Sequence, residues 1–208
     1  GSVTAGNTTV CCYYADTAKV WAGVGAGNSL AAGSISGYNI DLKGYTTQVG
    51  NLTAVGGLTA SGTDLTTGTV SAANATFSAA NALTTSTISG ANVSLAANTF
   101  ATGNLTASNN LTITSSAGYA PNGVALSANS ATINAVDDIS VLGNNGGTSL
   151  TANTVSLNSS SGNVSAELTN TSNLTINGDL DGNGTADMEI KLLGTNVANI
   201  DQGDIFGG

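Results

Sequence analysis

Residues 68–88 read GTVSAANATFSAANALTTSTI, and this stretch shows the pattern on which the expected fold depends. Single apolar residues alternate with Ser, Thr or Ala over three to five positions, and Asn or Gly lies between the alternating stretches. A period of two is typical of β-strands, because successive side chains of a strand point to opposite faces. Asn and Gly both tolerate the backbone angles of tight turns. The pattern therefore predicts short β-strands separated by tight turns, and it carries no helical stripe.

The same texture extends from residue 49 to residue 176. Its recurring unit is an aliphatic residue, then Ser or Thr, then Ala or a second aliphatic residue. Examples are Leu52-Thr53-Ala54, Val70-Ser71-Ala72, Val93-Ser94-Leu95, Leu105-Thr106-Ala107, Leu111-Thr112-Ile113 and Leu174-Thr175-Ile176. Many short strands joined in this way fit two architectures. One is an antiparallel β-sandwich, and the other is a parallel β-helix (β-solenoid) in which coils of about 20 residues stack on one another.

Three features favour the solenoid, and we expect an all-β, right-handed parallel β-helix. The residues expected to face inward are small, as the narrow interior of a coil requires. Asn recurs beside the turns, where the side-chain amides of stacked coils can form ladders. No Lys occurs between residues 44 and 190. Charge is disfavoured there because equivalent positions of neighbouring coils lie about 4.8 Å apart, and like charges at that distance repel.

The composition limits the partners of this chain of 208 residues. It has 12 acidic residues against 3 Lys and no Arg or His, which gives a formal net charge of −9. Binding to nucleic acid or to an anionic membrane surface needs clustered basic residues, so neither partner is expected. No apolar run approaches the roughly 18 residues needed to cross a bilayer, so membrane insertion is not expected either. Metal cations are the natural partners of such an acidic chain.

The segment from residue 177 to residue 208 departs from this uncharged texture, because it begins with a loop of the calcium-binding pattern D-x-D-x-N-G-x-x-D. In such loops, side-chain oxygens of alternate residues converge on one ion, Gly permits the sharp turn, and a backbone carbonyl adds a ligand. We therefore expect Ca²⁺ to be bound by Asp179, Asp181, Asn183, Thr185 and Asp187. Ile190 stands where a full EF-hand loop has a bidentate Glu, so water or a remote carboxylate such as Asp201 or Asp204 would complete the site. The alternative is an Asp/Asn/Gly-rich hairpin loop that binds nothing.

Two resemblances extend these expectations. The repeats of residues 49–176 resemble, in texture, the β-helical repeats of secreted bacterial exoproteins of the filamentous-haemagglutinin type and of related adhesins. The stretch GDLDGNGTADMEIKLLGTNVANIDQGDIFGG, residues 178–208, resembles the C-terminal segment of type I-secreted repeats-in-toxin proteins and of some S-layer proteins. The shared pattern is an Asp/Asn/Gly loop, then Ala-Asp-aromatic-x-Ile-x-Leu-x-Gly, with Met188 here in place of the aromatic residue. This resemblance implies export through an uncleaved C-terminal signal, an extracellular or cell-surface location, and calcium supplied by the medium.

Residues 1–48 form a third segment, for which we expect a capping or subunit-contact role. The stretch VTAGNTTVCCYYADTAKVW, residues 3–21, is the most apolar and aromatic part of the chain. It fits a cap on the first coil, an aromatic contact with a neighbouring subunit, or a strand donated to that subunit. The two adjacent cysteines either lie on opposite faces of a strand or pair with another chain. The residues expected at a subunit contact are Cys11, Cys12, Tyr13, Tyr14 and Trp21.

Catalysis is not expected, because the chain has no His and no convincing acid–base pair. The adjacent Asp137 and Asp138 would point apart on a strand, so they would not form a glycosidase pair. We expect instead an extracellular structural protein that assembles with itself, head to tail, into a filament or surface layer stabilised by calcium. The alternative is a surface adhesin, or a module that binds glycans or ice. Regular Thr-x-Thr rows would favour ice, and such pairs are only scattered along the sequence.

Overall fold

The computed structural model confirms an all-β parallel solenoid. The part of the chain that it describes contains no helix, and its strand ladders are parallel. The alternative of an antiparallel β-sandwich is therefore wrong for these residues, whereas the right-handed winding stays a prediction. The described residues are 3–5, 8–9, 17–22, 25–143, 146–169, 171–178 and 188–192.

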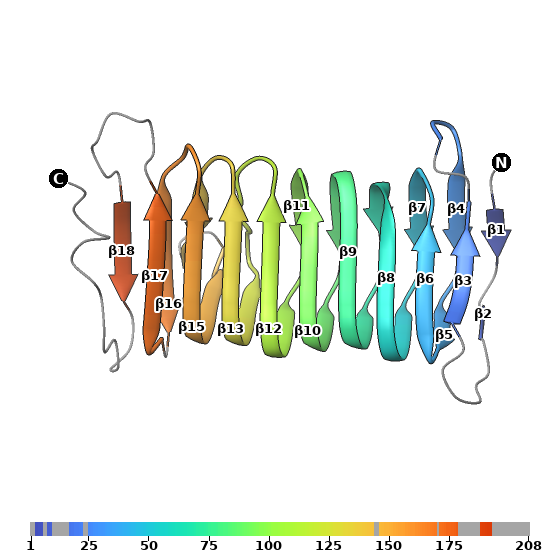
Figure 1. Ribbon diagram of the computed structural model, residues 1–208, viewed down its shortest axis with the longest axis horizontal. Coiled ribbons are helices and arrows are strands. Elements are labelled where there is room, and N and C mark those ends of the chain that lie inside the picture. Colours follow the sequence, from blue (N-terminus) through green and yellow to red (C-terminus); the bar gives the residue numbers. More distant parts are fainter. Residues whose placement is uncertain are drawn as a thin grey trace. The chain divides into compact units, whose positions relative to one another are not determined.

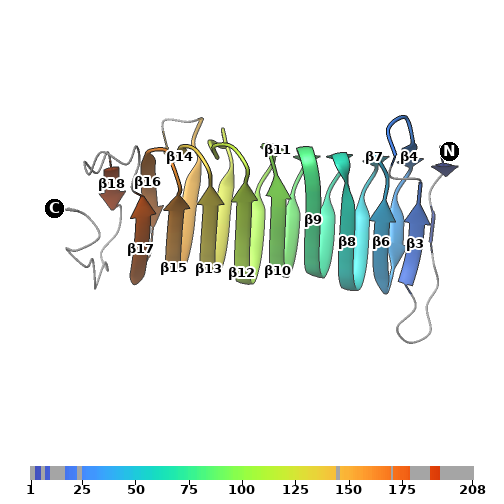
Figure 2. The same cartoon turned by 45° about the horizontal axis from the view of Figure 1, so that its top comes forward.

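The chain forms two compact units, residues 1–103 (unit 1) and residues 104–208 (unit 2). Within each unit, successive coils place their strands side by side (Figures 1 and 2). The strands of unit 1 are β1 (Val3–Ala5), β2 (Thr8–Thr9), β3 (Thr17–Trp21), β4 (Ser29–Ala32), β5 (Ile35–Gly37), β6 (Asn39–Lys43), β7 (Thr46–Val49), β8 (Leu52–Thr66), β9 (Val70–Thr85), β10 (Ile88–Ala97) and β11 (Thr99–Thr102). The strands of unit 2 are β12 (Leu105–Ser115), β13 (Ala125–Ala135), β14 (Ile139–Val141), β15 (Ser149–Ser159), β16 (Val164–Thr169), β17 (Asn173–Gly178) and β18 (Met188–Leu192).

A coil of unit 1 has three straight stretches separated by corners, as β8 shows. The stretches 52–54, 57–62 and 64–66 of β8 pair with residues of β9 that lie 17 or 18 positions later, and the register shifts between the stretches. We name the three surfaces face A, face B and face C in this order. Each face consists of one of these stretches together with the residues that pair with it in neighbouring coils.

The expectation that all strands are short is wrong. The strands β8 and β9 contain 15 and 16 residues, because the hydrogen-bonded strand continues around the corners of the coil. The alternation of buried and exposed side chains is interrupted at each corner. The sequence therefore shows only short alternating stretches, each of which corresponds to one face.

Unit 2 has longer coils than unit 1. Its face B (residues 110–115 and the residues in register with them) places Ile113, Ile133, Leu157 and Ile176 in one row, with successive spacings of 20, 24 and 19 residues. The additional residues lie in the connections between β12 and β13 and between β14 and β15. The straight stretches thus keep their register while the corners take up insertions.

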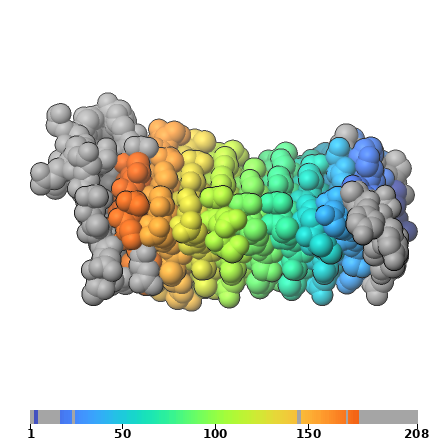
Figure 3. Space-filling model, turned by 60° about the horizontal axis from the view of Figure 1, so that its bottom comes forward, coloured from blue at the N-terminus to red at the C-terminus, as the bar shows by residue number. Residues whose placement is uncertain are grey.

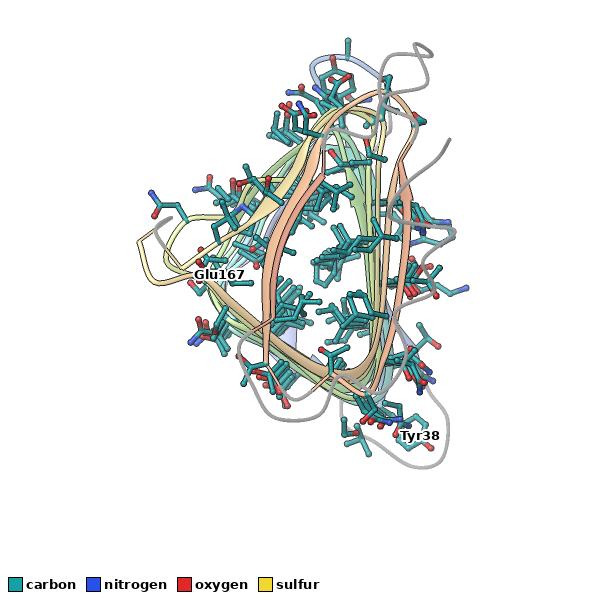
Figure 4. All side chains as sticks on the ribbon, turned by 90° about the vertical axis from the view of Figure 1, so that its left-hand side faces the viewer. Tyr38 and Glu167 are labelled. Carbon is teal, nitrogen blue, oxygen red and sulfur yellow. The ribbon has the colours of Figure 1, made fainter. Side chains whose placement is uncertain are left out.

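The interior of the coils is filled by rows of apolar side chains, as Figure 4 shows in a view along the stack. On face A of unit 1, Leu52, Val70 and Ile88 follow one another in register, and all three are fully buried. The buried residues are mainly Leu, Ile, Val and Ala, and the largest are Phe77 in unit 1 and Tyr119 in unit 2. Each coil therefore buries its apolar side chains against the coils next to it.

The expected ladders of Asn side chains are confirmed at two places. In unit 1, Asn92 donates a hydrogen bond from Nδ2 to Oδ1 of Asn74 in the preceding coil, at 2.8 Å. In unit 2, Asn158 donates in the same way to Asn134, also at 2.8 Å. An amide can donate to one neighbour and accept from another, so such ladders join coils without any charge.

Gly90 lies where two coils approach closely, and we expect Gly90→Ala to lower the free energy of unfolding by about 1–3 kcal/mol. A Cβ atom at this position would overlap the backbone oxygen of Ala72 in the preceding coil. Gly25→Ala is the matched control, because the nearest atom to a Cβ there is the side-chain nitrogen of Asn28, at an ordinary distance of 3.6 Å. Urea denaturation followed by circular dichroism measures both variants. Equal losses in the two would contradict the close approach at Gly90.

Candidate functional site

Two lysines flank the single tryptophan of the chain on face B of unit 1. The strands β3 and β6 pair so that Lys19 lies beside Asp41 and Trp21 lies beside Lys43. The Nζ atoms of Lys19 and Lys43 are 5.3 Å and 4.5 Å from the centroid of the Trp21 ring. Both distances fall within the range of about 6 Å over which an ammonium group is attracted to an aromatic face. We name these four residues the Lys–Trp cluster.

The Lys–Trp cluster is accessible and combines apolar with cationic surface. Trp21 is 49% exposed, Lys19 is exposed and Lys43 is half-buried. The Oδ1 atom of Asp41 is buried and has no hydrogen-bond partner among the described residues. Two of the three lysines of the chain meet here, so this is the most cationic place in an otherwise acidic protein. The arrangement suits an acidic partner that also brings apolar side chains.

Only one of the five residues predicted for subunit contact can be placed. Trp21 belongs to the Lys–Trp cluster, whereas Cys11, Cys12, Tyr13 and Tyr14 lie outside the described residues. Sequence reasoning missed both lysines. The position of Lys19, two residues before Trp21, is a signal that could have been used, because alternate residues of a strand share a face. The contribution of Lys43 depends on the pairing of β3 with β6, whose offset of 22 residues differs from that of later coils.

Hydroxyl side chains form rows on the outside of face B. In unit 1, the exposed residues Thr59, Thr76 and Ser94 are in register in three successive coils. A row of the same kind in unit 2 consists of Thr112, Thr132, Ser156 and Thr175. Figure 3 shows one side of the molecule, on which the outer side chains of successive coils form parallel bands. Hydroxyl groups that are scattered along the sequence are therefore aligned in space, at a spacing of about 4.8 Å.

A second exposed apolar site lies at the corner between faces A and B of unit 1. Tyr38 is 41% exposed, and Val55, at the same corner of the next coil, is 71% exposed. The two coils are joined there by a hydrogen bond from the N–H of Gly56 to the carbonyl of Tyr38, at 2.8 Å. Figure 4 shows the Tyr38 ring outside the ribbon at this corner. Neither residue is charged, so the corner gives no indication of a ligand class.

The predicted calcium ligands Asp179, Asp181, Asn183, Thr185 and Asp187 lie outside the described residues, but the strands on either side of them are described. Gly178 in β17 pairs with Ser159, and Met188 in β18 pairs with Val164. In the preceding coil these two partners are joined by the four residues 160–163, whereas the nine residues 179–187 make the later connection. The acidic loop is therefore an insertion at a corner of the last described coil.

Three other carboxylates of unit 2 stabilise connections. Asp138 accepts a hydrogen bond from the N–H of Asn163 at 2.6 Å, and the neighbouring Asp137 accepts one from a serine hydroxyl at 3.4 Å. Both lie at the corner between β13 and β14, which corrects the expectation that a strand separates them. Glu167, labelled in Figure 4, accepts from the N–H of Gly143 at 2.9 Å. Among the described residues, no three metal-ligating side chains come together.

The chain was compared with protein-family models, with characterised proteins and with solved structures, and none of them matches it. In the part of the chain that the structure describes, no helix has the length and apolar character needed to cross a membrane. The class of the protein therefore follows from its own structure. It is a parallel β-solenoid with uncharged outer rows and one cationic, aromatic cluster.

Proposed function

We propose that this protein is an extracellular structural subunit that joins copies of itself, head to tail, into a filament or surface layer. The observation that carries the proposal is the regular stacking of similar, uncharged coils. Rows such as Thr59, Thr76 and Ser94 continue from coil to coil without like-charge repulsion. A coil from a second molecule can therefore join the stack by the same parallel pairing that holds the coils of one molecule together.

The outermost described strands supply edges for such an addition. The strands β1, β2 and β3 each pair with one described strand, namely β4, β5 and β6. In unit 2, β17 and β18 likewise each pair with one, namely β15 and β16. The free N–H and C=O groups along a strand edge act as a template for another chain. Parallel stacking already includes β1 to β7, so the segment 1–48 takes part in the solenoid whose growth we propose.

Calcium is the proposed regulator of this assembly. The loop 179–187 lies between β17 and β18, so an ion bound there would fix a corner of the last described coil. The ligands expected from the sequence all offer oxygen atoms, which calcium prefers. Three carboxylates in nine residues repel one another unless a cation lies between them. Binding of calcium therefore favours the ordered end of the solenoid, to which a second molecule would add.

Removal of calcium is expected to reverse the assembly. In millimolar calcium, sedimentation velocity and electron microscopy of the purified full chain should show particles larger than a monomer, and excess EGTA should dissociate them. Asp181→Asn should shift the calcium concentration at half-assembly upward by about tenfold, because it removes one charged ligand. Asp64→Asn, which removes a carboxylate in unit 1, is the matched control and should leave that concentration unchanged. A single monomeric species in calcium at every protein concentration would rule out assembly, and filaments that ignore EGTA would rule out the role of calcium.

A second function is favoured by the aligned hydroxyl rows of face B. Rows of Thr and Ser about 4.8 Å apart present a regular, uncharged hydrogen-bonding surface, which suits binding to glycans or to ice. Ice-recrystallisation and glycan-binding assays on the monomeric fraction separate this function from assembly. Activity that Thr76→Val reduces in a monomer would support the binding function over the structural one.

A further inference from the structure

We infer that the Lys–Trp cluster is the docking surface for the acidic C-terminal segment, residues 177–208, of a second copy of this chain. The inference rests on the proposed head-to-tail assembly and identifies a contact that would hold two copies together. It depends on the shape and chemistry of the cluster, on the distribution of charge along the chain, and on the place of the cluster in unit 1.

The cluster has the properties of a preformed binding surface. Trp21 is 49% exposed, and tryptophan is enriched among the residues that contribute most to protein interfaces. The ammonium groups of Lys19 and Lys43 lie 5.3 Å and 4.5 Å from its ring centroid, so the ring and both charges are held in place before binding. Prior order of this kind lowers the conformational entropy that association costs. Neither ammonium group forms an ion pair with a described carboxylate, so both can accept one from a partner.

The distribution of charge selects the partner. Residues 177–208 carry half of the 12 acidic residues of the chain and only one lysine. The other six acidic residues are spread over residues 1–176. The segment also ends with Ile205 and Phe206, which can pack against an exposed indole ring. Its acidic residues are Asp179, Asp181, Asp187, Glu189, Asp201 and Asp204.

The place of the cluster agrees with a head-to-tail contact. Its residues belong to β3 and β6, and β3 pairs with one described strand of face B. A segment bound at Trp21 would therefore lie beside the edge of β3, where a second solenoid could add. The C-terminal segment follows β17 in the chain, so the contact joins the first described layer of one copy to the last described layer of the other.

The single tryptophan provides a direct test, because its fluorescence reports on this surface alone. A synthetic peptide of residues 177–208 contains neither Trp nor Tyr, so it is silent when the full chain is excited selectively at Trp21. In calcium-containing buffer, we expect the peptide to shift the Trp21 emission to shorter wavelength in a saturable manner. The double variant Lys19→Gln/Lys43→Gln should bind the peptide about tenfold more weakly. Lys191→Gln changes the net charge by the same amount per substitution but lies outside the cluster, and it should leave the affinity unchanged.

The outcomes separate this inference from the proposed function. If the wild-type chain forms large particles but the peptide does not alter Trp21 emission, the docking surface is wrong and the assembly stands. If the peptide binds but no particle larger than a dimer forms, the assembly is wrong and the docking surface stands. Equal binding by the double variant, or by a peptide in which every Asp and Glu is replaced by Asn and Gln, would overturn the inference. Circular dichroism of each variant confirms that it is folded before it is compared.

Discussion

Phe77→Ala is expected to lower the free energy of unfolding by about 3–5 kcal/mol, the range for removal of a buried aromatic ring. Phe77 is 1% exposed and is the largest fully buried side chain of unit 1. Its neighbours in the inner row are Ala60 in the preceding coil and Leu95 in the next. The coils on both sides are held at ladder spacing by parallel pairing, so the walls of the cavity cannot move together. The cost should therefore include a large cavity contribution in addition to the lost burial.

Ser78→Ala is the matched control for this substitution. Ser78 is the next residue of β9 and points outward, so its loss should change the free energy of unfolding by no more than about 0.5 kcal/mol. Urea denaturation followed by circular dichroism measures both variants. Hydrogen exchange should locate the effect of Phe77→Ala in β8, β9 and β10, because a coil contacts only its neighbours. A loss below about 1 kcal/mol would show that the coils collapse around the cavity.

The side-chain pattern was sufficient to predict the stacking, since the inward and outward positions of a strand alternate whatever its partner is. Leu52-Thr53-Ala54 and Val70-Ser71-Ala72 are in register in unit 1, with the aliphatic residues and alanines buried. The near absence of charge then separated the solenoid from the sandwich. Only in-register stacking brings equivalent residues together many times over, so only that arrangement penalises every charged position.

The corners could not be predicted, because the hydrogen bonding there does not depend on alternation. The strands β8 and β9 continue around corners at which the burial pattern is broken, so the sequence marks an end where the ladder has none. The same freedom lets the coils of unit 2 take up extra residues between straight stretches. The length of a coil is therefore a property of its corners, and the pattern of its faces does not reveal it.

The calcium loop and the Lys–Trp cluster show the same limit for functional residues. The ligands expected for calcium are close in sequence, and their spacing alone is a sufficient signal for a prediction. Lys43 reaches Trp21 only through the pairing of β3 with β6, across an offset of 22 residues. A contact of that kind needs the register of two coils, which no local pattern provides.

Three aspartates in one outer row are expected to cost about 2 kcal/mol more than three aspartates in separate rows. The stacked variant is Thr59→Asp/Thr76→Asp/Ser94→Asp, whose positions are exposed and in register in successive coils of unit 1. Carboxylates about 4.8 Å apart repel by about 1 kcal/mol per neighbouring pair even in water, and the row contains two such pairs. The poor β-propensity of Asp adds up to about 1 kcal/mol at each position. The stacked variant should therefore lose about 3–5 kcal/mol in total.

The dispersed control isolates the electrostatic part of this loss. Thr53→Asp/Thr76→Asp/Thr99→Asp places the same number of charges at exposed positions of three different faces, so it keeps the propensity cost without adjacent carboxylates. At about 1 M salt the screening length falls to about 3 Å, so the difference between the two variants should largely disappear. If the two variants are equally stable at low salt, like-charge repulsion does not explain why the outer rows lack charge. The uncharged rows would then reflect a demand of the outer surface itself, which would favour a binding function for face B over growth by stacking.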